Sequence, residues 1–297
     1  MNKCPHPATR SWIAGAQFSA RVTEAQSFLS AYFAPTPLIA ARRISAATGC
    51  DVYLKLESSL PTGSFKPRGA LFAIYSQLKE KPIREVVTAS TGNHGAAVAY
   101  AARQFGLSAT IFLPFNSNRQ KRSKIVKFGA AIREAGKDLA EAAVAAAAYA
   151  ATEDAYLLDD ASDPAVPIAA ATIACEIFDQ LPTVQKIYVP VGDSALIRGI
   201  ASVEKRRPLP PQLIGVQAER APSYYDSWKA AAVRPSDLCD TIADGLATRR
   251  PLASNVAAMC KLVDDFVLVS EEALINSFGT RRKSLASQQA QHPQQRC

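Results

Sequence analysis

The chain has 297 residues, of which 48% are hydrophobic and 20% are charged, and its formal net charge is +8 at pH 7. These values are typical of a globular protein with one large or two moderate domains, and they exclude a disordered or fibrous chain. No stretch has the roughly 18 uninterrupted apolar residues that a membrane helix needs, and the first residues lack the apolar block of a secretory signal. We therefore expect a cytoplasmic protein that has no membrane partner.

Cysteines, histidines and basic residues are all spread along the chain. The six cysteines form no C-x-x-C pair, and the three histidines have no partner at the spacing of metal ligands. Lys and Arg are not interleaved with aromatic residues, and several of the excess positive charges lie between residues 279 and 297. We expect reduced thiols, no metal site and no nucleic-acid partner.

The first part of the chain predicts a few separate elements. Residues 20–32 have helical periodicity. Residues 38–47 favour either a short helix or a strand followed by a helix, and residues 52–56 alternate as a strand does. Lys66 opens the next predicted helix, whose apolar positions between residues 69 and 77 fall on one face.

From residue 84 onward, short strands and helices alternate. The predicted strands are 85–89, 109–113, 131–134, 156–158, 186–191, 213–217 and 266–269. The predicted helices are 94–105, 119–128, 138–152, 165–180, 223–231, 256–262 and one that begins at residue 270. Such alternation is typical of βαβ units, so we predict an α/β fold with parallel sheets. Residues 279–297 show no apolar periodicity and are predicted to be a disordered tail.

The stretch Pro61–Ala70 contains one lysine in an ordered setting. Lys66 lies between the ring of Phe65 and Pro67, at the start of a predicted helix. A lysine amine reacts as a nucleophile only when its pKa is lowered and its flexible stem is held, and these two neighbours could do both. Taken alone, a lysine after Gly-Ser is more often a solvated loop residue, so the other motifs decide its meaning.

Two further stretches each predict a strand, then a turn of small residues, then a helix. They are Thr88–Ala97 and Ile187–Gly199. Such turns present backbone N–H groups at a helix N-terminus, where the helix dipole favours an anion. A carboxylate or a phosphate would fit at either turn.

The segments SFKPRGA, STGNHG and VPVGDSALIRGIA, in this order and at these separations, resemble the fold-type II pyridoxal phosphate dependent enzymes. Within that group they resemble the serine/threonine dehydratases, also called ammonia-lyases, and the serine racemases. The segments KLESS at residue 55 and TIADGLA at residue 241 add to the resemblance, which runs from about Pro35 to about Leu274.

The resemblance implies a tryptophan synthase β-like fold of two open parallel-sheet α/β domains with the cofactor between them. Residues 1–50 and 155–278 would form the large cofactor-binding domain, to which residues 51–82 contribute. Residues 83–154 would form the small domain. Relatives have a long helix and a closing strand where this chain has residues 279–297, so the C-terminus is expected to be truncated or altered.

The resemblance also implies an activity. Lys66 would bind pyridoxal 5'-phosphate covalently, and its freed amine would remove the Cα proton of a small amino acid. Loss of the β-hydroxyl of serine, threonine or a similar substrate would then give a 2-keto acid and ammonia. A serine racemase, a β-replacement enzyme and a catalytically inactive truncated paralogue remain open alternatives. A homodimer or homotetramer is expected.

Residue roles follow from the same resemblance. Phe65 and Asn93 are expected to contact the cofactor ring, and Thr91 stands where a racemase would use a serine for proton transfer. The residues expected to hold the substrate carboxylate are Ser90, Thr91, Gly92, Asn93 and His94. The residues expected to hold the cofactor phosphate are Gly192, Asp193, Ser194, Ala195 and Leu196.

Two positions depart from the family pattern. Most relatives have four consecutive glycines in the phosphate turn, whereas this chain has Asp193, and a carboxylate about 4 Å from a phosphate costs on the order of 1 to 4 kcal/mol. Either Arg198 neutralises it or the carboxylate faces outward. Gln217 stands where relatives have a metal-binding carboxylate, with Ser223 as the downstream partner, so no metal is predicted.

Overall fold

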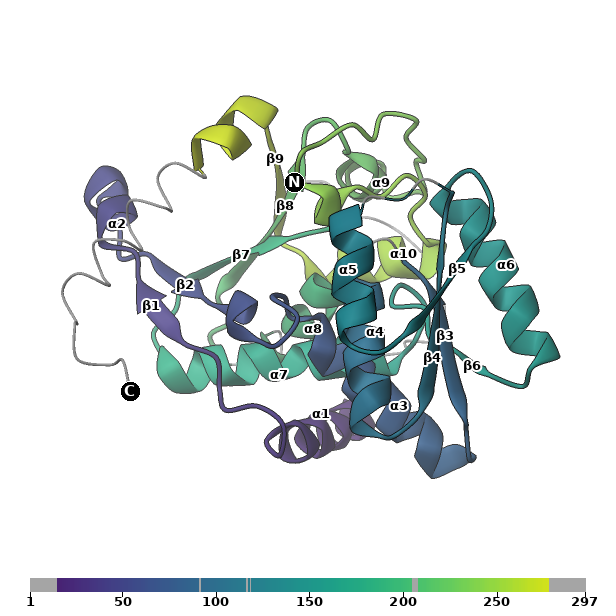
Figure 1. Ribbon diagram of the computed structural model, residues 1–297. Coiled ribbons are helices and arrows are strands. Elements are labelled where there is room, and N and C mark those ends of the chain that lie inside the picture. Colours follow the sequence, from purple (N-terminus) through teal and green to yellow (C-terminus); the bar gives the residue numbers. More distant parts are fainter. Residues whose placement is uncertain (1–14, 91, 116, 118, 205–207, 278–297) are drawn as a thin grey trace, which may run out of the picture.

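The computed structural model describes residues 15–90, 92–115, 117, 119–204 and 208–277 (Figure 1). Two of the predictions, the role of Thr91 and the disorder of residues 279–297, fall outside the described residues.

The elements follow the predicted order. The strands are β1 (Leu38–Ala40), β2 (Tyr53–Lys55), β3 (Glu85–Ala89), β4 (Ser108–Leu113), β5 (Ala131–Glu134), β6 (Tyr156–Leu157), β7 (Lys186–Pro190), β8 (Gln212–Ala218) and β9 (Asp265–Val269). The α-helices are α1 (Gly15–Leu29), α2 (Arg42–Thr48), α3 (Lys66–Glu80), α4 (Asn93–Gln104), α5 (Arg119–Lys127), α6 (Leu139–Thr152), α7 (Ala165–Gln180), α8 (Ala195–Glu204), α9 (Ser223–Ala230) and α10 (Ala253–Leu262). Residues 271–277 are also helical, and two short 3₁₀ turns are η1 (Glu57–Ser59) and η2 (Asp244–Leu246).

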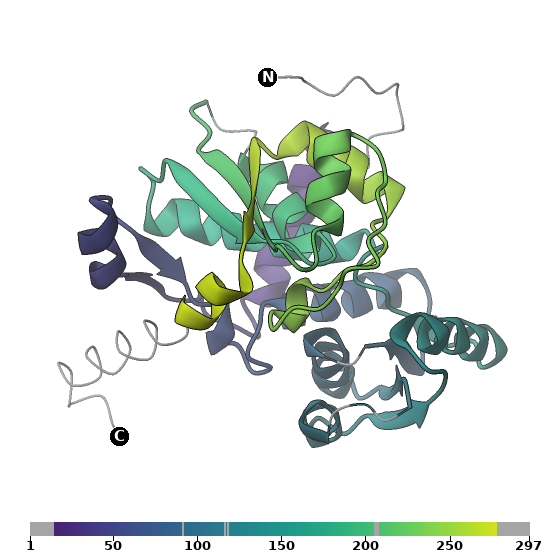
Figure 2. The same cartoon turned by 90° about the horizontal axis from the view of Figure 1, so that it is seen from above.

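A four-stranded parallel sheet has the order β5-β4-β3-β6. Helix α6 packs on one of its faces and α4 on the other (Figures 1 and 2). The inner strands β3 and β4 are buried almost without interruption, as expected for parallel strands that are covered on both sides. The sheet includes β6 and therefore extends past residue 154, where we placed the end of the small domain.

A three-stranded parallel sheet has the order β7-β8-β9. Its apolar residues share a core with α7, α8, α9 and α10. Strand β7 lies at the edge of this sheet, and Tyr188 on β7 is 60% exposed. The predicted parallel α/β architecture is confirmed by both sheets.

A small antiparallel pair, β1 and β2, stands apart from the two larger sheets. Of the two alternatives for residues 38–47, the strand followed by a helix is the one that forms. The pairing of β1 with β2 was not predicted, because three-residue strands carry too little alternation to reveal a partner.

Helix α7 joins the parts of the molecule, since it packs against α1, α3 and α8. Small residues allow these close contacts. A Cβ on Gly69 would lie 2.9 Å from Val166 Cγ1, and a Cβ on Gly199 would overlap the carbonyl oxygen of Pro167. Helix α3, which begins with Lys66, is therefore held directly on α7.

An ion-pair network reinforces this contact. Arg68 is 2% exposed, and its guanidinium donates to Glu57 at 2.9 and 3.0 Å and to Glu176 at 2.6 Å. Lys55 Nζ donates to the same Glu176 carboxylate at 2.6 Å. The network connects β2, η1, α3 and α7, so it fixes the first turn of α3 from two sides.

Replacing Arg68 by Met is expected to lower the free energy of unfolding by about 3 to 5 kcal/mol, because two partly buried carboxylates lose their shared cation. Urea denaturation measures this change. The matched control is Lys81→Met, which removes an ion pair with Asp154 in which both side chains are more than half exposed, and it should cost less than about 1 kcal/mol. Equal effects of the two substitutions would contradict the role of the network.

Candidate active site

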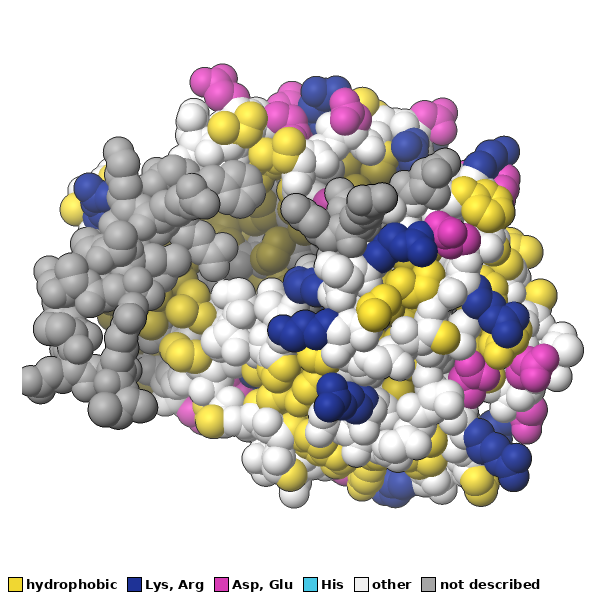
Figure 3. Space-filling model, viewed as in Figure 1, with side chains coloured by type: hydrophobic (Ala, Val, Ile, Leu, Met, Phe, Trp, Pro, Cys, Tyr) yellow, Lys and Arg dark blue, Asp and Glu magenta, His cyan; other side chains and the backbone are white. Residues whose placement is uncertain are grey.

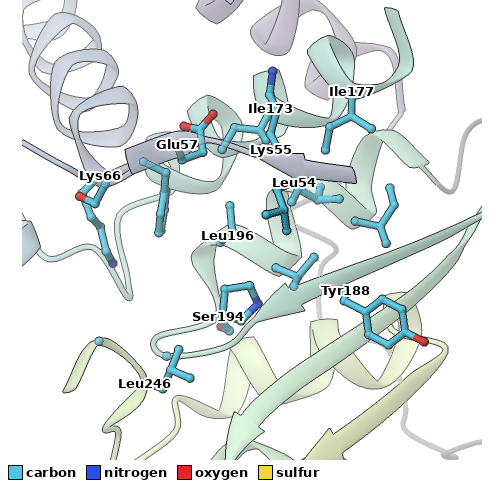
Figure 4. A pocket seen from close by; sticks show the side chains of 18 of the residues that line it. Leu54, Lys55, Glu57, Lys66, Ile173, Ile177, Tyr188, Ser194, Leu196 and Leu246 are labelled. Atoms are coloured by element: carbon cyan, nitrogen blue, oxygen red, sulfur yellow. The ribbon is translucent and has the colours of Figure 1, made fainter. Parts of the chain in front are cut away.

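A cleft of about 1930 Å³ lies between the two parallel sheets. Figure 3 shows a hollow in this face of the molecule with hydrophobic side chains recessed in it, and Figure 4 shows side chains that line the cleft. The cleft is lined by the start of α3, the turn before α4, the turn before α8 and the segment around η2. Of the predicted site residues that the structure describes, all but Ala195 line it.

Lys66 reaches into this cleft from the first turn of α3 (Figure 4). Its Nζ donates to Asp160 Oδ2 at 2.5 Å and to Asp193 Oδ2. The Phe65 ring also faces this ammonium, with 5.1 Å between Nζ and the ring centroid, which is a cation–π contact. Pro67 occupies the first turn of α3, where it favours helix initiation. The expected immobilisation of the lysine is thus present.

The expected lowering of the Lys66 pKa is wrong. Burial disfavours the charged amine, but the carboxylates of Asp160 and Asp193 outweigh burial and raise the pKa of Lys66 above its ordinary value. The amine is therefore held as an ammonium ion, and it must lose a proton before it can react as a nucleophile.

The two carboxylates differ in their own pKa. Burial opposes the charge of Asp160, yet the neighbouring His94 and Lys66 outweigh it and lower the pKa of Asp160. For Asp193, burial together with repulsion by Asp160 outweighs Lys66 and raises the pKa. A pair of acids whose pKa values are pushed in opposite directions is a common feature of acid–base sites. Asp193 is the one of the two that accepts a proton more readily.

His94 is buried at the start of α4 and faces Asp160. Its Nε2 is 3.0 Å from the carbonyl oxygen of Leu158, and because a carbonyl can only accept, Nε2 carries the hydrogen. Its Nδ1 lies 3.4 Å from Asp160 Oδ2. His94 therefore lies against Asp160, an acidic neighbour that the sequence did not predict for it.

The turn between β3 and α4 is compact. Ser90 Oγ accepts a hydrogen bond from the N–H of Gly92 at 3.3 Å, and a Cβ on Gly95 would lie 2.8 Å from the carbonyl oxygen of Ser90. The first N–H groups of α4 have no acceptor within the helix, so they favour an anion. Asn93 opens α4 and lines the same cleft as Lys66.

The turn between β7 and α8 has little space for side chains. A Cβ on Gly192 would overlap the carbonyl oxygen of Gly245, so only glycine fits there. Ser194 has φ +75°, a left-handed conformation that non-glycine residues seldom adopt. Asp193 Oδ1 accepts a hydrogen bond from the N–H of Ala195 at 2.8 Å and so caps α8 with the chain's own carboxylate.

Neither of the two predicted positions for the Asp193 carboxylate describes it fully. It does not face outward, and its ion pair is with Lys66. Arg198 donates to Ser194 Oγ at 3.0 Å and to the carbonyl oxygen of Ala161 at 3.2 Å. The Lys66 ion pair was missed because its partners are far apart in the sequence.

Gln217 and Ser223 are both buried and hydrogen-bonded. Gln217 Oε1 accepts from the N–H of Tyr225 at 3.0 Å, and Ser223 Oγ donates to the carbonyl oxygen of Thr248 at 2.5 Å. Within the described ranges, no three or more His, Cys, Asp or Glu side chains are grouped to hold a metal ion.

Among the residues that the structure describes, no helix is both long enough and apolar enough to cross a membrane.

Comparison with known proteins identifies the family. Residues 29–279 match the family described as "Pyridoxal-phosphate dependent enzyme". The chain belongs to this family. Its architecture is that of the fold-type II enzymes, which confirms the predicted fold.

Individual relatives agree with this assignment. The chain is 34% identical over 253 residues to an L-threonine ammonia-lyase of Geobacter sulfurreducens, covering 85% of this chain and 63% of that protein. It is 35% identical over 256 residues to an L-threonine ammonia-lyase of Thermotoga maritima, covering 86% and 64%. The chain thus spans less than two thirds of the length of these two relatives. The structure of maize serine racemase is similar with a TM-score of 0.82 and 27% identity, covering 86% of this chain and 78% of that one.

The cleft contains suitable groups for pyridoxal phosphate. Lys66 supplies an amine for the aldehyde, Asn93 supplies an uncharged amide, and the turn at Gly192 brings backbone to a helix N-terminus without a Cβ in the way. Asp193 places a carboxylate at the phosphate end, where a negative charge opposes the binding of an anion. The residues therefore fit the cofactor, provided that this carboxylate can leave the N-terminus of α8.

Replacing Lys66 by Met in the cofactor-free protein is expected to destabilise it in a pH-dependent way. In the native protein the pKa of Asp160 is lowered, so its contribution is fully present above its unfolded pKa of about 4 and is lost as the pH falls through the lower folded value. Without the ammonium, Asp160 and Asp193 repel each other and their pKa values rise, so their ionisation costs stability as the pH rises.

The penalty of Lys66→Met should therefore be about 3 to 5 kcal/mol near pH 8 and should shrink toward about pH 5. Urea denaturation at both pH values measures the difference between the two proteins. His94 and Arg198 also face this pair, and they are present in both proteins. The control is Lys124→Met, which changes another lysine of the cleft. A Lys66 penalty that is independent of pH would contradict the assigned charges.

Proposed function

We propose that the protein is a pyridoxal phosphate dependent ammonia-lyase. It would eliminate the β-hydroxyl of L-serine, L-threonine or a similar small amino acid and give a 2-keto acid and ammonia. The observation that carries the proposal is that one cleft combines a half-buried lysine with two helix N-termini, one for each anionic group that such a reaction must hold. The two L-threonine ammonia-lyases at 34% and 35% identity support the same activity.

The cofactor would be held by residues of three segments. Lys66 would bind its aldehyde, Phe65 and Asn93 would contact its ring, and the turn of residues 192–196 would hold its phosphate. When bound, pyridoxal phosphate supplies an electron sink that stabilises negative charge at the Cα of an amino acid. No side chain of the protein can supply that chemistry.

The substrate carboxylate would bind at the turn before α4. The backbone N–H groups of Asn93 and His94 open helix α4, where the helix dipole favours a negative charge. The short side chain of Ser90 already accepts a hydrogen bond within this turn, which leaves its hydroxyl hydrogen free to be donated. This binding would fix the orientation of the Cα–H bond relative to Lys66.

Asp193 and Asp160 would divide the proton handling. Lys66 Nζ must lose a proton before it can react, and Asp193 Oδ2 is in hydrogen-bond contact with it. Because the pKa of Asp193 is raised and that of Asp160 is lowered, Asp193 would take the proton while Asp160 stays ionised. The neutral amine of Lys66 would then accept the Cα proton of the substrate.

Racemisation is a second candidate because the similar structure with a TM-score of 0.82 is a serine racemase. Both reactions begin with removal of the Cα proton, and they differ in whether the β-hydroxyl leaves or a proton returns to the opposite face. β-Replacement would share the elimination step. A catalytically inactive paralogue would retain the cleft without turnover.

We also propose that the protein is cytoplasmic and that it forms a homodimer or a homotetramer.

Purified protein with added cofactor is expected to form 2-keto acid and ammonia from L-threonine or L-serine. Lys66→Ala should lower kcat by at least about 10³-fold, because it removes both the covalent anchor and the proton acceptor. Lys124→Met, the matched change of another lysine in the cleft, should retain activity. Three measurements distinguish the competing reactions. A keto-acid assay measures elimination, chiral analysis of the remaining amino acid measures racemisation, and trapping with a thiol measures β-replacement.

Each alternative has its own outcome. Loss of enantiomeric purity without keto acid would favour a racemase, and a thiol adduct as the main product would favour β-replacement. Cofactor binding without any product from either substrate would favour an inactive paralogue. Equal activity of Lys66→Ala and the unaltered protein would reject the proposed function.

A further inference from the structure

The Asp193 carboxylate contacts both of the groups that the proposed function assigns to the cofactor at this end of the cleft, the N-terminus of α8 and Lys66. Asp193 Oδ1 accepts the N–H of Ala195 at 2.8 Å, which is at the N-terminus of α8, and Asp193 Oδ2 accepts from Lys66 Nζ. We propose that Asp193 is an internal competitor for the cofactor phosphate, which holds the phosphate site of the cofactor-free protein and must leave it before the phosphate binds. This inference rests on the cofactor chemistry of the proposed function.

The competition follows from charge. A helix N-terminus stabilises a negative group through its N–H donors and its dipole, and its effect is confined to the first turn. A carboxylate bound there both occupies an N–H donor and repels a second anion. A phosphate is negatively charged, so the Asp193 carboxylate repels it. The carboxylate does not repel an uncharged ligand group in this way, so it weakens the binding of a phosphorylated ligand more than that of an unphosphorylated one.

The backbone of the turn is held independently of the Asp193 carboxylate. Tyr224 Oη donates to the carbonyl oxygen of Asp193 at 3.2 Å, and Asn255 Nδ2 lies 3.4 Å from the same oxygen. Arg198 Nε donates to Ser194 Oγ at 3.0 Å. The carboxylate can therefore rotate away or be replaced while the turn keeps its shape. The anion site would be retained and only its occupant would change.

Asp160 offers a matched control. It bonds to the same Lys66 ammonium at 2.5 Å, but it comes from the segment after β6, and its Oδ2 also lies 3.4 Å from His94 Nδ1. Removing the charge of Asp160 thus changes the surroundings of Lys66, whereas the Asp193–Ala195 hydrogen bond stays. A change that is specific to the phosphate site should appear in Asp193 variants alone.

The test compares pyridoxal phosphate with pyridoxal, which lacks the phosphate. Absorbance titrations of the cofactor-free proteins give both Kd values, and the ratio of the Kd for pyridoxal to the Kd for pyridoxal phosphate isolates the phosphate contribution. The ratio should rise by about tenfold or more in Asp193→Ala and Asp193→Asn. It should stay within about twofold of the unaltered value in Asp160→Asn. Asp193→Asn has nearly the same shape as the native residue and serves if the alanine variant does not fold.

A second measurement needs no cofactor. Inorganic phosphate should raise the melting temperature of Asp193→Ala or Asp193→Asn more than that of the unaltered protein, because the vacated helix N-terminus binds it. If phosphate stabilises the Asp193 variants but no protein binds pyridoxal phosphate, Asp193 still competes with an anion at this helix N-terminus, whereas its competition with the cofactor and the proposed function both fail. If all proteins bind the cofactor with the same ratio, the inference fails and the proposed function stands. An equal rise in Asp160→Asn, or no response to phosphate in any variant, also overturns the inference.

Discussion

A single ammonium ion shared by two carboxylates is the interaction on which the site depends. Lys66 begins α3, Asp160 follows the four-stranded sheet, and Asp193 lies in the turn after the first strand of the three-stranded sheet. The contact therefore ties the two sheets together across the cleft. It also sets the chemical state of the lysine, because two neighbouring negative charges hold the amine protonated. Stability of the cofactor-free cleft and reactivity of the lysine are thus opposed.

The position of Lys66 depends in turn on the packing of α3. Arg68, one residue beyond Pro67, is bonded to Glu57 and Glu176, and Gly69 allows α3 to approach Val166 of α7 closely. Helix α7 packs on α8 as well, so one helix supports both the lysine and the phosphate turn. A side chain that must meet two partners from different sheets needs such a common support.

Local patterns in the sequence predicted most of the fold and of the cleft. Periods of two and of about 3.6 residues are visible in the sequence and predicted the elements, whereas Lys66, Asn93 and Gly192 were expected together because their motifs resemble those of one enzyme family. The Lys66–Asp160 pair joins residues 94 positions apart, and no local pattern marks it. A closer look at the acidic residues just after the strand at 156–158 would have identified Asp160 as a candidate.

The direction of the Lys66 pKa could not be predicted for the same reason. Phe65 and Pro67 are local and suggested a lowered value, whereas the carboxylates that raise it arrive through tertiary structure. Likewise, the Asp193 side chain has a partner that only the assembled cleft provides. Backbone requirements were easier to anticipate, as Gly192 illustrates, because a turn of small residues before a helix is recognisable from sequence.

The most direct test of this account is to find where the protein binds its cofactor. Protein loaded with pyridoxal phosphate is reduced with borohydride, digested and mapped by mass spectrometry. The account predicts the reduced adduct on the peptide that contains Lys66, and its absence from that position in Lys66→Ala. An adduct found on another lysine of the cleft, or on none, would contradict it.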